Sequence, residues 1–232
     1  MYKRQLRNIL STYCQIPADF ILPGNGSSEL ISLLIEERRP KHTMILGPTY
    51  SEYSRELGFS DSTIDCFYLK PEQDFQLSVE ELCLALAKKQ IDFLILCNPN
   101  NPTGTLLSPN DVLRMHRDVR NSGGELIVDE AFIDYCTDAT VRHHVQDGLT
   151  VVGSLTKILC IPGVRLGYIC AVPEQIARLQ ERAVTWSLNV LASAVAAELP
   201  RHQAEIAADA QANQARAERF ARRLQEMGVR VT

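Results

Sequence analysis

Short apolar runs alternate along the chain with segments whose apolar residues recur at helical spacing. The run Phe93-Leu94-Ile95-Leu96-Cys97 is apolar throughout, which is typical of a strand covered on both faces of its sheet. Strands that alternate with helices favour parallel pairing through crossover connections. The pattern therefore predicts an α/β fold with a doubly wound, mostly parallel sheet. The predicted strands are Thr43–Leu46, Ile64–Leu69, Asp92–Cys97, Glu125–Asp129, Thr150–Gly153 and Gly167–Ala171, and the predicted helices between them are Ser28–Glu36, Tyr50–Leu57, Val79–Lys88 and Pro109–Arg120.

The pattern changes after Trp186, where long helical segments replace the alternation. An Ala- and Leu-rich helix is predicted from Leu188 to Leu199, with Pro200 breaking or restarting it. A second helix is predicted from Arg201 to Met227, with Gly228 as its C-cap and a strand beginning at Val229. We expect a large domain over residues 1–187, followed by a helical connection and the start of an incomplete small domain over residues 188–232.

Composition and charge exclude some classes of function. The chain has 232 residues and a net charge of −4, with its basic residues scattered, so a nucleic-acid partner is not expected. No apolar run is long enough to span a bilayer, and we expect a cytoplasmic protein without a membrane partner. The seven cysteines are odd in number and include no Cys-x-x-Cys pair, so reduced thiols are expected. The pair His143-His144 lacks a third ligand at suitable spacing, and no metal site is predicted.

Lys157 is the main candidate for covalent chemistry. It follows the predicted strand Thr150–Gly153, and open α/β sheets bind their ligands at the carboxyl ends of strands. Ser154 and Thr156 supply hydroxyl groups beside it, and Arg165 supplies a planar guanidinium suited to a phosphate. An amine that captures an aldehyde next to a phosphate cradle is what pyridoxal 5′-phosphate (PLP) requires of a protein. An ordinary solvated lysine is the alternative.

Two further segments fit the same cofactor. Gly26 and Ser27 lie in a glycine turn that leads into a helix, where backbone N–H groups can bind a phosphate. A simple helix cap is the alternative there. Asp129 ends a buried strand, and its carboxylate could keep a pyridine nitrogen protonated, with Glu130 as the competing candidate and a structural aspartate as the alternative.

Asn101 and Tyr50 complete the candidate set. Asn101 lies between Pro99 and Pro102 after a strand, and its amide could donate to the ring oxygen of the cofactor. An ordinary proline turn is the alternative, and a cis bond before Pro102 is compatible with the pattern. Tyr50 follows the first predicted strand and could stack on the pyridine ring, or pack in the core.

Taken together in this order, these motifs resemble fold-type I PLP enzymes of the class I/II aminotransferase family. The resemblance runs from about Gln5 to Leu199. It implies that Lys157 forms the Schiff base, Asp129 faces the pyridinium, Asn101 contacts the ring oxygen and Tyr50 stacks on the ring. It assigns the phosphate to Gly26, Ser27, Ser154, Thr156 and Arg165. A substrate contact by Asn101 and a homodimer of the full-length protein are further expectations.

Two groups within the family are similar to this chain: histidinol-phosphate aminotransferases and the threonine-phosphate decarboxylases of cobalamin biosynthesis. Aminotransferases usually carry a tyrosine where this chain has Phe132, and the segments at Asp129–Asp134 and Trp186–Asn189 resemble the decarboxylases. The resemblance therefore favours decarboxylation of a phosphorylated amino acid over transamination. Relatives also have an amino-terminal arm and a small domain with a carboxylate-binding arginine, which we expect to be missing here. An inactive fragment of the fold is the remaining alternative. A nucleotide-binding module is disfavoured, because no Gly-x-Gly-x-x-Gly or Walker pattern follows the first strand.

Overall fold

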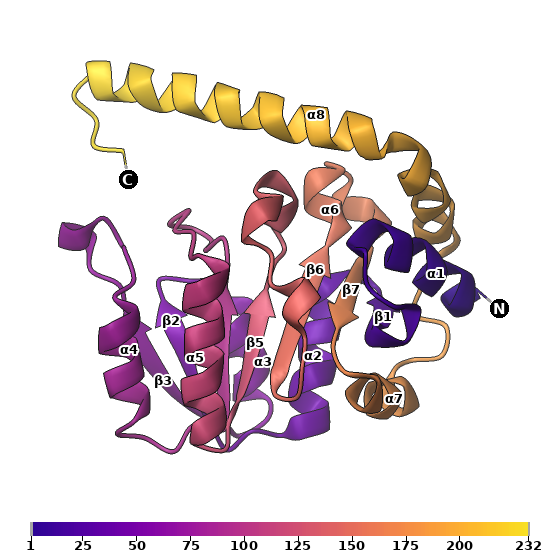
Figure 1. Ribbon diagram of the computed structural model, residues 1–232, viewed down its shortest axis with the longest axis horizontal. Helices are drawn as coiled ribbons and strands as arrows, with labels where there is room; N and C mark the ends of the chain where they lie inside the picture. The colour runs from indigo at the N-terminus through magenta and orange to yellow at the C-terminus, as the bar shows by residue number, and fades with distance from the viewer. Residues whose placement is uncertain (1, 232) are drawn as a thin grey trace.

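A central sheet covered by helices on both faces forms the body of the protein (Figure 1). The computed structural model describes residues 2–231. Within them, seven strands form one sheet in the order β1-β7-β6-β5-β4-β2-β3. The strands are β1 Ile21–Gly24, β2 His42–Gly47, β3 Thr63–Tyr68, β4 Phe93–Cys97, β5 Glu125–Asp129, β6 Leu149–Ser154 and β7 Gly167–Cys170. The helices are α1 Tyr2–Cys14, α2 Gly26–Arg38, α3 Glu52–Gly58, α4 Val79–Leu86, α5 Pro109–Asn121, α6 Leu155–Ile158, α7 Pro173–Arg182 and α8 Val190–Glu226.

The strand directions confirm the predicted fold and add one reversal. Strands β2 to β6 pair in parallel. Strand β7 is antiparallel to both β6 and β1, so β1 points the same way as the parallel strands. All six predicted strands are present, with ends that differ by no more than one residue, whereas β1 was not predicted.

Successive side chains of a strand point to opposite faces of the sheet, so they pack into two separate hydrophobic cores. Leu94 and Leu96 of β4 pack on one face with α1, α4, α5 and the start of α8. Ile95 packs on the other face with α2, α3 and α7. This division explains why β4 is apolar at every position, since both of its faces are buried.

Two of the helices begin at a serine that caps them. The side chains of Ser78 and Ser108 accept hydrogen bonds from the backbone N–H of Glu81 and Asp111, at the starts of α4 and α5. The predicted break at Pro200 is wrong, because α8 continues through it as one helix. Gly228 has φ of +79° just beyond the end of α8, as a residue after a helix end often does. Residues 229–231 form no strand, and Thr232 lies outside the described residues.

Helix α8 crosses the molecule above the edge of the sheet where the parallel strands end, drawn in yellow at the top of Figure 1. Its first turns pack on α1 through the buried residues Ala192, Ala196 and Leu199. Farther along, Gln214 donates a hydrogen bond of 2.6 Å to the carbonyl of Tyr135. The long helix therefore contacts α1 near its start and the segment after β5 farther along.

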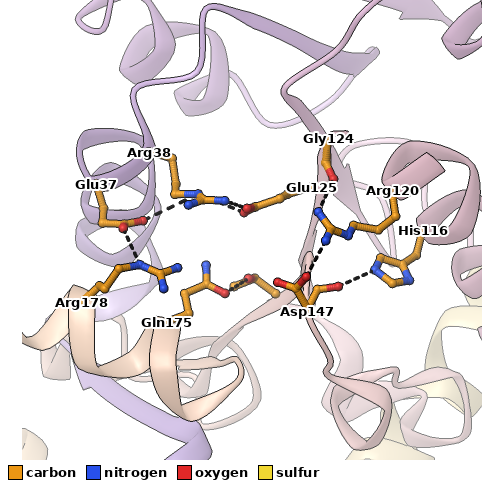
Figure 2. Close-up of polar contacts among 10 residues, drawn as sticks. Glu37, Arg38, His116, Arg120, Gly124, Glu125, Asp147, Gln175 and Arg178 are labelled. Carbon is orange, nitrogen blue, oxygen red and sulfur yellow. Dashed lines mark hydrogen bonds and ion pairs between the residues drawn. The ribbon is translucent and has the colours of Figure 1, made fainter. Parts of the chain in front are cut away.

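At the amino ends of the parallel strands, charged and polar side chains connect the helices to the sheet and to each other (Figure 2). Arg38 at the end of α2 pairs with Glu125, the first residue of β5. Arg178 of α7 donates to Glu37 over 2.9 Å. His116 of α5 hydrogen-bonds the carbonyl of Asp147 over 3.1 Å. These contacts tie α2 and α5 to the amino ends of β5 and β6 and join α7 to α2, away from the candidate site.

In the part of the chain that the structure describes, no helix combines the length and apolarity that crossing a membrane would require.

Candidate active site

The candidate residues meet at the carboxyl ends of the parallel strands, on one side of the molecule. Asp129 is the last residue of β5, and Lys157 lies in the first turn after β6. Asn101 follows β4 and Tyr50 follows β2. The carboxyl ends of parallel strands share one edge, which is where open α/β sheets bind ligands.

The reversed strand β7 brings Arg165 to this same edge. Because β7 is antiparallel to β6, its first residue Gly167 pairs with Ser154, the last residue of β6. Gly167 also pairs with Gly24, the last residue of β1, after which α2 begins at Gly26. Arg165 therefore lies beside the amino-terminal end of α2.

A cavity of about 100 Å³, partly open to solvent, lies at the carboxyl ends of these strands. Eight of the nine predicted cofactor residues line it: Ser27, Tyr50, Asn101, Asp129, Ser154, Thr156, Lys157 and Arg165. The ninth, Gly26, does not line the cavity but touches the Arg165 side chain. Four residues that were not predicted to bind the cofactor also line it, namely Ser28, Cys97, Ala131 and Phe132.

One end of the cavity carries hydroxyl groups and a guanidinium. The hydroxyls of Ser154 and Thr156 lie 2.9 Å apart and are both buried. Ser27 lies in the first turn of α2, whose unpaired backbone N–H groups favour an anion. Arg165 brings a fixed positive charge to the same cavity. This donor set is suited to a phosphate group.

Two glycines make this end possible. Gly26 has φ of +84°, and a Cβ atom there would lie 2.4 Å from Nη2 of Arg165. A Cβ atom at Gly167 would lie 2.6 Å from the backbone nitrogen of Ser27. The absence of side chains at both positions lets the start of α2 and the guanidinium approach the strand ends closely.

The structure distinguishes between the two adjacent carboxylates. Asp129 lines the cavity and is 3% exposed. Its Oδ1 accepts from the backbone N–H of Ala131 over 2.9 Å. Burial raises the pKa of Asp129, whereas its hydrogen bonds and the charge of Lys157 act in the opposite direction.

Glu130 points elsewhere and does not line the cavity. Its carboxylate accepts from the hydroxyl of Thr140 and from the backbone N–H of Val141, each over 2.6 Å. Burial raises the pKa of Glu130 to about 7. Of the two carboxylates, Asp129 is therefore the one available to a ligand in the cavity.

Lys157 is exposed at the mouth of the cavity, so its amine is free to move toward a ligand. Its Nζ lies 5.5 Å from the centre of the Phe132 ring, within the range of a cation–π contact. The hydroxyl of Tyr135 donates to the backbone carbonyl of Lys157 over 3.0 Å and so holds the main chain at this point.

Tyr53 is a residue near the site that the sequence analysis missed. It is fully buried on α3, and its hydroxyl donates to Oδ2 of Asp129 over 2.6 Å. Its ring also meets that of Tyr50 edge to face, with the centroids 5.5 Å apart. The available signal was the spacing of three between Tyr50 and Tyr53, which places both side chains on one face of the helix predicted over Tyr50–Leu57.

Comparisons with known proteins identify the family. The model of the family "Aminotransferase class I and II" matches residues 3–232. This chain belongs to the class I and II aminotransferase family.

Individual relatives divide between two activities. The threonine-phosphate decarboxylase of Salmonella typhimurium is 36% identical over 193 residues, which cover 81% of this chain and 52% of that protein. A histidinol-phosphate aminotransferase of Desulfitobacterium hafniense is 34% identical over 192 residues, which cover 80% of this chain and 52% of that protein. The chain thus spans about half the length of these curated relatives.

Solved structures agree on the fold. A decarboxylase from Sulfurospirillum multivorans superimposes with a TM-score of 0.87 at 24% identity, covering 97% of this chain and 66% of that one. The histidinol-phosphate aminotransferase from Clostridium acetobutylicum gives 0.85 at 24% identity, covering 97% and 67%. At such identities the likeness establishes the α/β fold, whereas the choice of reaction has to be argued from the site.

Proposed function

We propose that this chain forms the PLP-binding part of an enzyme that decarboxylates a phosphorylated amino acid. The cavity fits the cofactor in two ways. At one end, Arg165, the start of α2 and the buried hydroxyls of Ser154 and Thr156 form a donor set suited to a phosphate. At the other end, Asp129 is a buried carboxylate of the kind that pairs with a protonated ring nitrogen.

Each lining residue has a defined task in this proposal. Arg165 and the hydroxyls of Ser27, Ser154 and Thr156 would hold the phosphate, with Gly26 making room for the guanidinium. Tyr50 would cover one face of the ring, and Asn101 would donate to the ring oxygen and border the substrate. Lys157 would bind the aldehyde carbon and later carry a proton. PLP, when bound, supplies an electron sink for the bond that breaks next to the amine.

Phe132 is the observation that favours decarboxylation. It lines the cavity beside Lys157 and has no hydroxyl to contact the ring oxygen, unlike the tyrosine that the family resemblance leads us to expect in aminotransferases. Our specific proposal is conversion of L-threonine O-3-phosphate to (R)-1-amino-2-propanol O-2-phosphate with release of carbon dioxide, a step of cobalamin biosynthesis. Other relatives support this class of substrate, including a putative threonine-phosphate decarboxylase of Caldanaerobacter subterraneus and an L-serine phosphate decarboxylase of Sulfurospirillum multivorans.

Binding of the cofactor is tested by spectroscopy on the purified chain. We expect added PLP to produce the visible absorption band of the cofactor linked to a lysine amine. The Lys157→Ala variant should lose this band, and Lys88→Ala, which changes an exposed lysine outside the cavity, should keep it. A band that persists in Lys157→Ala would remove Lys157 from the proposal. The absence of a band in the wild-type chain would favour the alternative of an inactive fragment.

The reaction is tested on the full-length gene product that contains this chain. We expect carbon dioxide from threonine phosphate, and no glutamate from histidinol phosphate with 2-oxoglutarate. Glutamate without carbon dioxide would establish the second candidate, a histidinol-phosphate aminotransferase, which the relative from Desulfitobacterium hafniense favours.

The remaining features of the proposal concern the whole protein. We propose a cytoplasmic homodimer in which residues 1–187 form the PLP-binding domain and residues 188–232 lead into a small domain. The length of the curated relatives supports this division, since about half of each lies outside the matched region. Chromatography of the full-length protein with light scattering would test the dimer.

A further inference from the structure

Asp129 is held by two donors that leave part of its carboxylate open. The backbone N–H of Ala131 donates to Oδ1 over 2.9 Å, and the hydroxyl of Tyr53 donates to Oδ2 over 2.6 Å. An ionised carboxylate has about four acceptor positions, so further ones remain for a ligand in the cavity. Because each oxygen has its own fixed partner, the plane of the carboxylate is set by the protein rather than by the ligand.

The groups around Asp129 come from three elements. Tyr53 faces it from α3, Cys97 from β4 and Lys157 from α6. Burial raises the pKa of Asp129, and the hydrogen bond from Tyr53 is the largest of the influences that lower it. The amine of Lys157 acts more weakly and lies on an exposed side chain. Tyr53 is therefore the main side chain that favours the charged form.

The hydroxyl of Tyr53 stays protonated and can therefore donate a hydrogen bond to Asp129. Burial, followed by the nearby charge of Asp129, raises its pKa well above the ordinary value, so its hydroxyl keeps its proton at neutral pH. The described residues that line the cavity do not include Tyr53. Any influence it has on a bound cofactor must pass through a neighbour that lines the cavity: Asp129, Cys97 or the ring of Tyr50.

We propose that Tyr53 is a positioning residue, which fixes the Asp129 carboxylate in its orientation and in its charged form toward the ring nitrogen of the cofactor. This inference rests on the proposed PLP chemistry for its purpose, although the hydrogen bond itself is independent of any ligand. In this arrangement Tyr50 lies against the face of the pyridine ring. Tyr53 binds Asp129, the carboxylate that pairs with the ring nitrogen.

The experiment compares wild type with Tyr53→Phe, which removes only the hydroxyl. The carboxyl carbon of Asp129 is followed by NMR during a pH titration of cofactor-free protein labelled at aspartate, with Asp129→Asn giving the assignment. Hydrogen bonds to charged groups are strong enough that we expect the acid dissociation constant of Asp129 to fall by about tenfold. The dissociation constant for PLP should rise by a similar factor, because the charged form of Asp129 becomes less populated and less well oriented.

Tyr168→Phe is the matched control, since Tyr168 is also fully buried and its hydroxyl binds Arg142 rather than Asp129. It should lower the unfolding temperature without changing the acid constant of Asp129. If Tyr53→Phe does not fold, the hydroxyl proton of Tyr53 in wild type provides a second measurement, and its chemical shift should follow the titration of Asp129.

The outcomes separate this inference from the proposed function. An unchanged acid constant in folded Tyr53→Phe, or a hydroxyl shift that ignores Asp129, would overturn the role of Tyr53 whether or not PLP binds. Loss of PLP binding in Tyr168→Phe as large as that in Tyr53→Phe would also overturn it, because the effect would then be general destabilisation. Failure of wild type to bind PLP would refute the proposed function instead, leaving the acid-constant comparison intact.

Discussion

Two neighbouring residues with the same functional group have different surroundings here, and strand geometry is the reason. Asp129 and Glu130 follow each other at the end of β5, where successive side chains point to opposite faces. Asp129 therefore meets Tyr53 and the cavity, whereas Glu130 meets Thr140 and Val141. Sequence reasoning left both candidates open, because a terminal strand residue does not reveal which face the next element covers.

At the same scale, Gly26 gives a direct test of the phosphate end. Gly26→Ala would place a Cβ atom 2.4 Å from Nη2 of Arg165 and would strain a backbone with φ of +84°. We expect a loss of about 1 to 3 kcal/mol in the free energy of unfolding and weaker binding of PLP, because the guanidinium must move. Thermal unfolding and a PLP titration measure the two effects. In Gly163→Ala, where the added atom meets nothing within 4 Å and φ is not positive, both should stay near wild type.

At the scale of elements, the periodic segments were predictable and the interrupted ones were not. β1 is short and contains Pro23 and Gly24, residues that argue against a strand unless it lies at an edge, as this one does. Helix α1 was not predicted, although its pattern was readable, with Leu6, Leu10 and Cys14 buried at a spacing of four. Pro200 was expected to break a helix, yet α8 continues because alanine-rich turns on both sides favour helix strongly enough to retain it.

The segment from Thr137 to Val145 is tied to β5 through Glu130, and this tie predicts a pH dependence. The pKa of Glu130 lies at about 7 in the folded protein and at 4.5 for an unperturbed side chain. A carboxyl with a raised pKa stabilises the fold fully below pH 4.5, and this contribution is lost as the pH rises through about 7. The loss amounts to about 3 kcal/mol, which urea unfolding at a series of pH values would detect.

Glu130→Gln cannot ionise, so the free energy of unfolding should fall less between pH 4.5 and 7 than in wild type. Asp129 and Asp134 have raised pKa values through burial and leave a residual slope of the same sign. Asp138→Asn is the control within the same segment, since Asp138 is exposed. If the free energy of unfolding of Glu130→Gln falls with pH as steeply as that of wild type, Glu130 stays charged throughout this range.

At the scale of the whole molecule, the order of motifs along the chain predicted where they would meet. Lys157, Asp129 and Asn101 each follow a strand that was recognised, so a parallel sheet was enough to place them at one edge. Arg165 also belongs there, although the sequence did not show that β7 runs in the opposite direction. What could not be predicted were contacts between helix and strand, such as that of Tyr53 with Asp129, since these depend on how α3 packs on the sheet.

Helix α8 is buried near its start and exposed toward its end, so its two halves should contribute unequally to stability. Leu199 is 2% exposed in the core with α1, whereas Phe220 is 65% exposed on the same helix. Leu199→Ala should lower the free energy of unfolding by about 2 to 5 kcal/mol, because it leaves a cavity in a packed core. Phe220→Ala should change it by no more than about 0.5 kcal/mol, since it removes little buried surface.

Hydrogen exchange along α8 is an independent measurement of the same difference. Amides near Ala192 to Leu199 should be protected close to the global limit, and those from Arg216 to Glu226 should exchange by local opening. Equal protection along all of α8, with equal losses in the two variants, would mean that the far half of the helix packs against other protein surface, and the single-chain account of its stability would then be wrong.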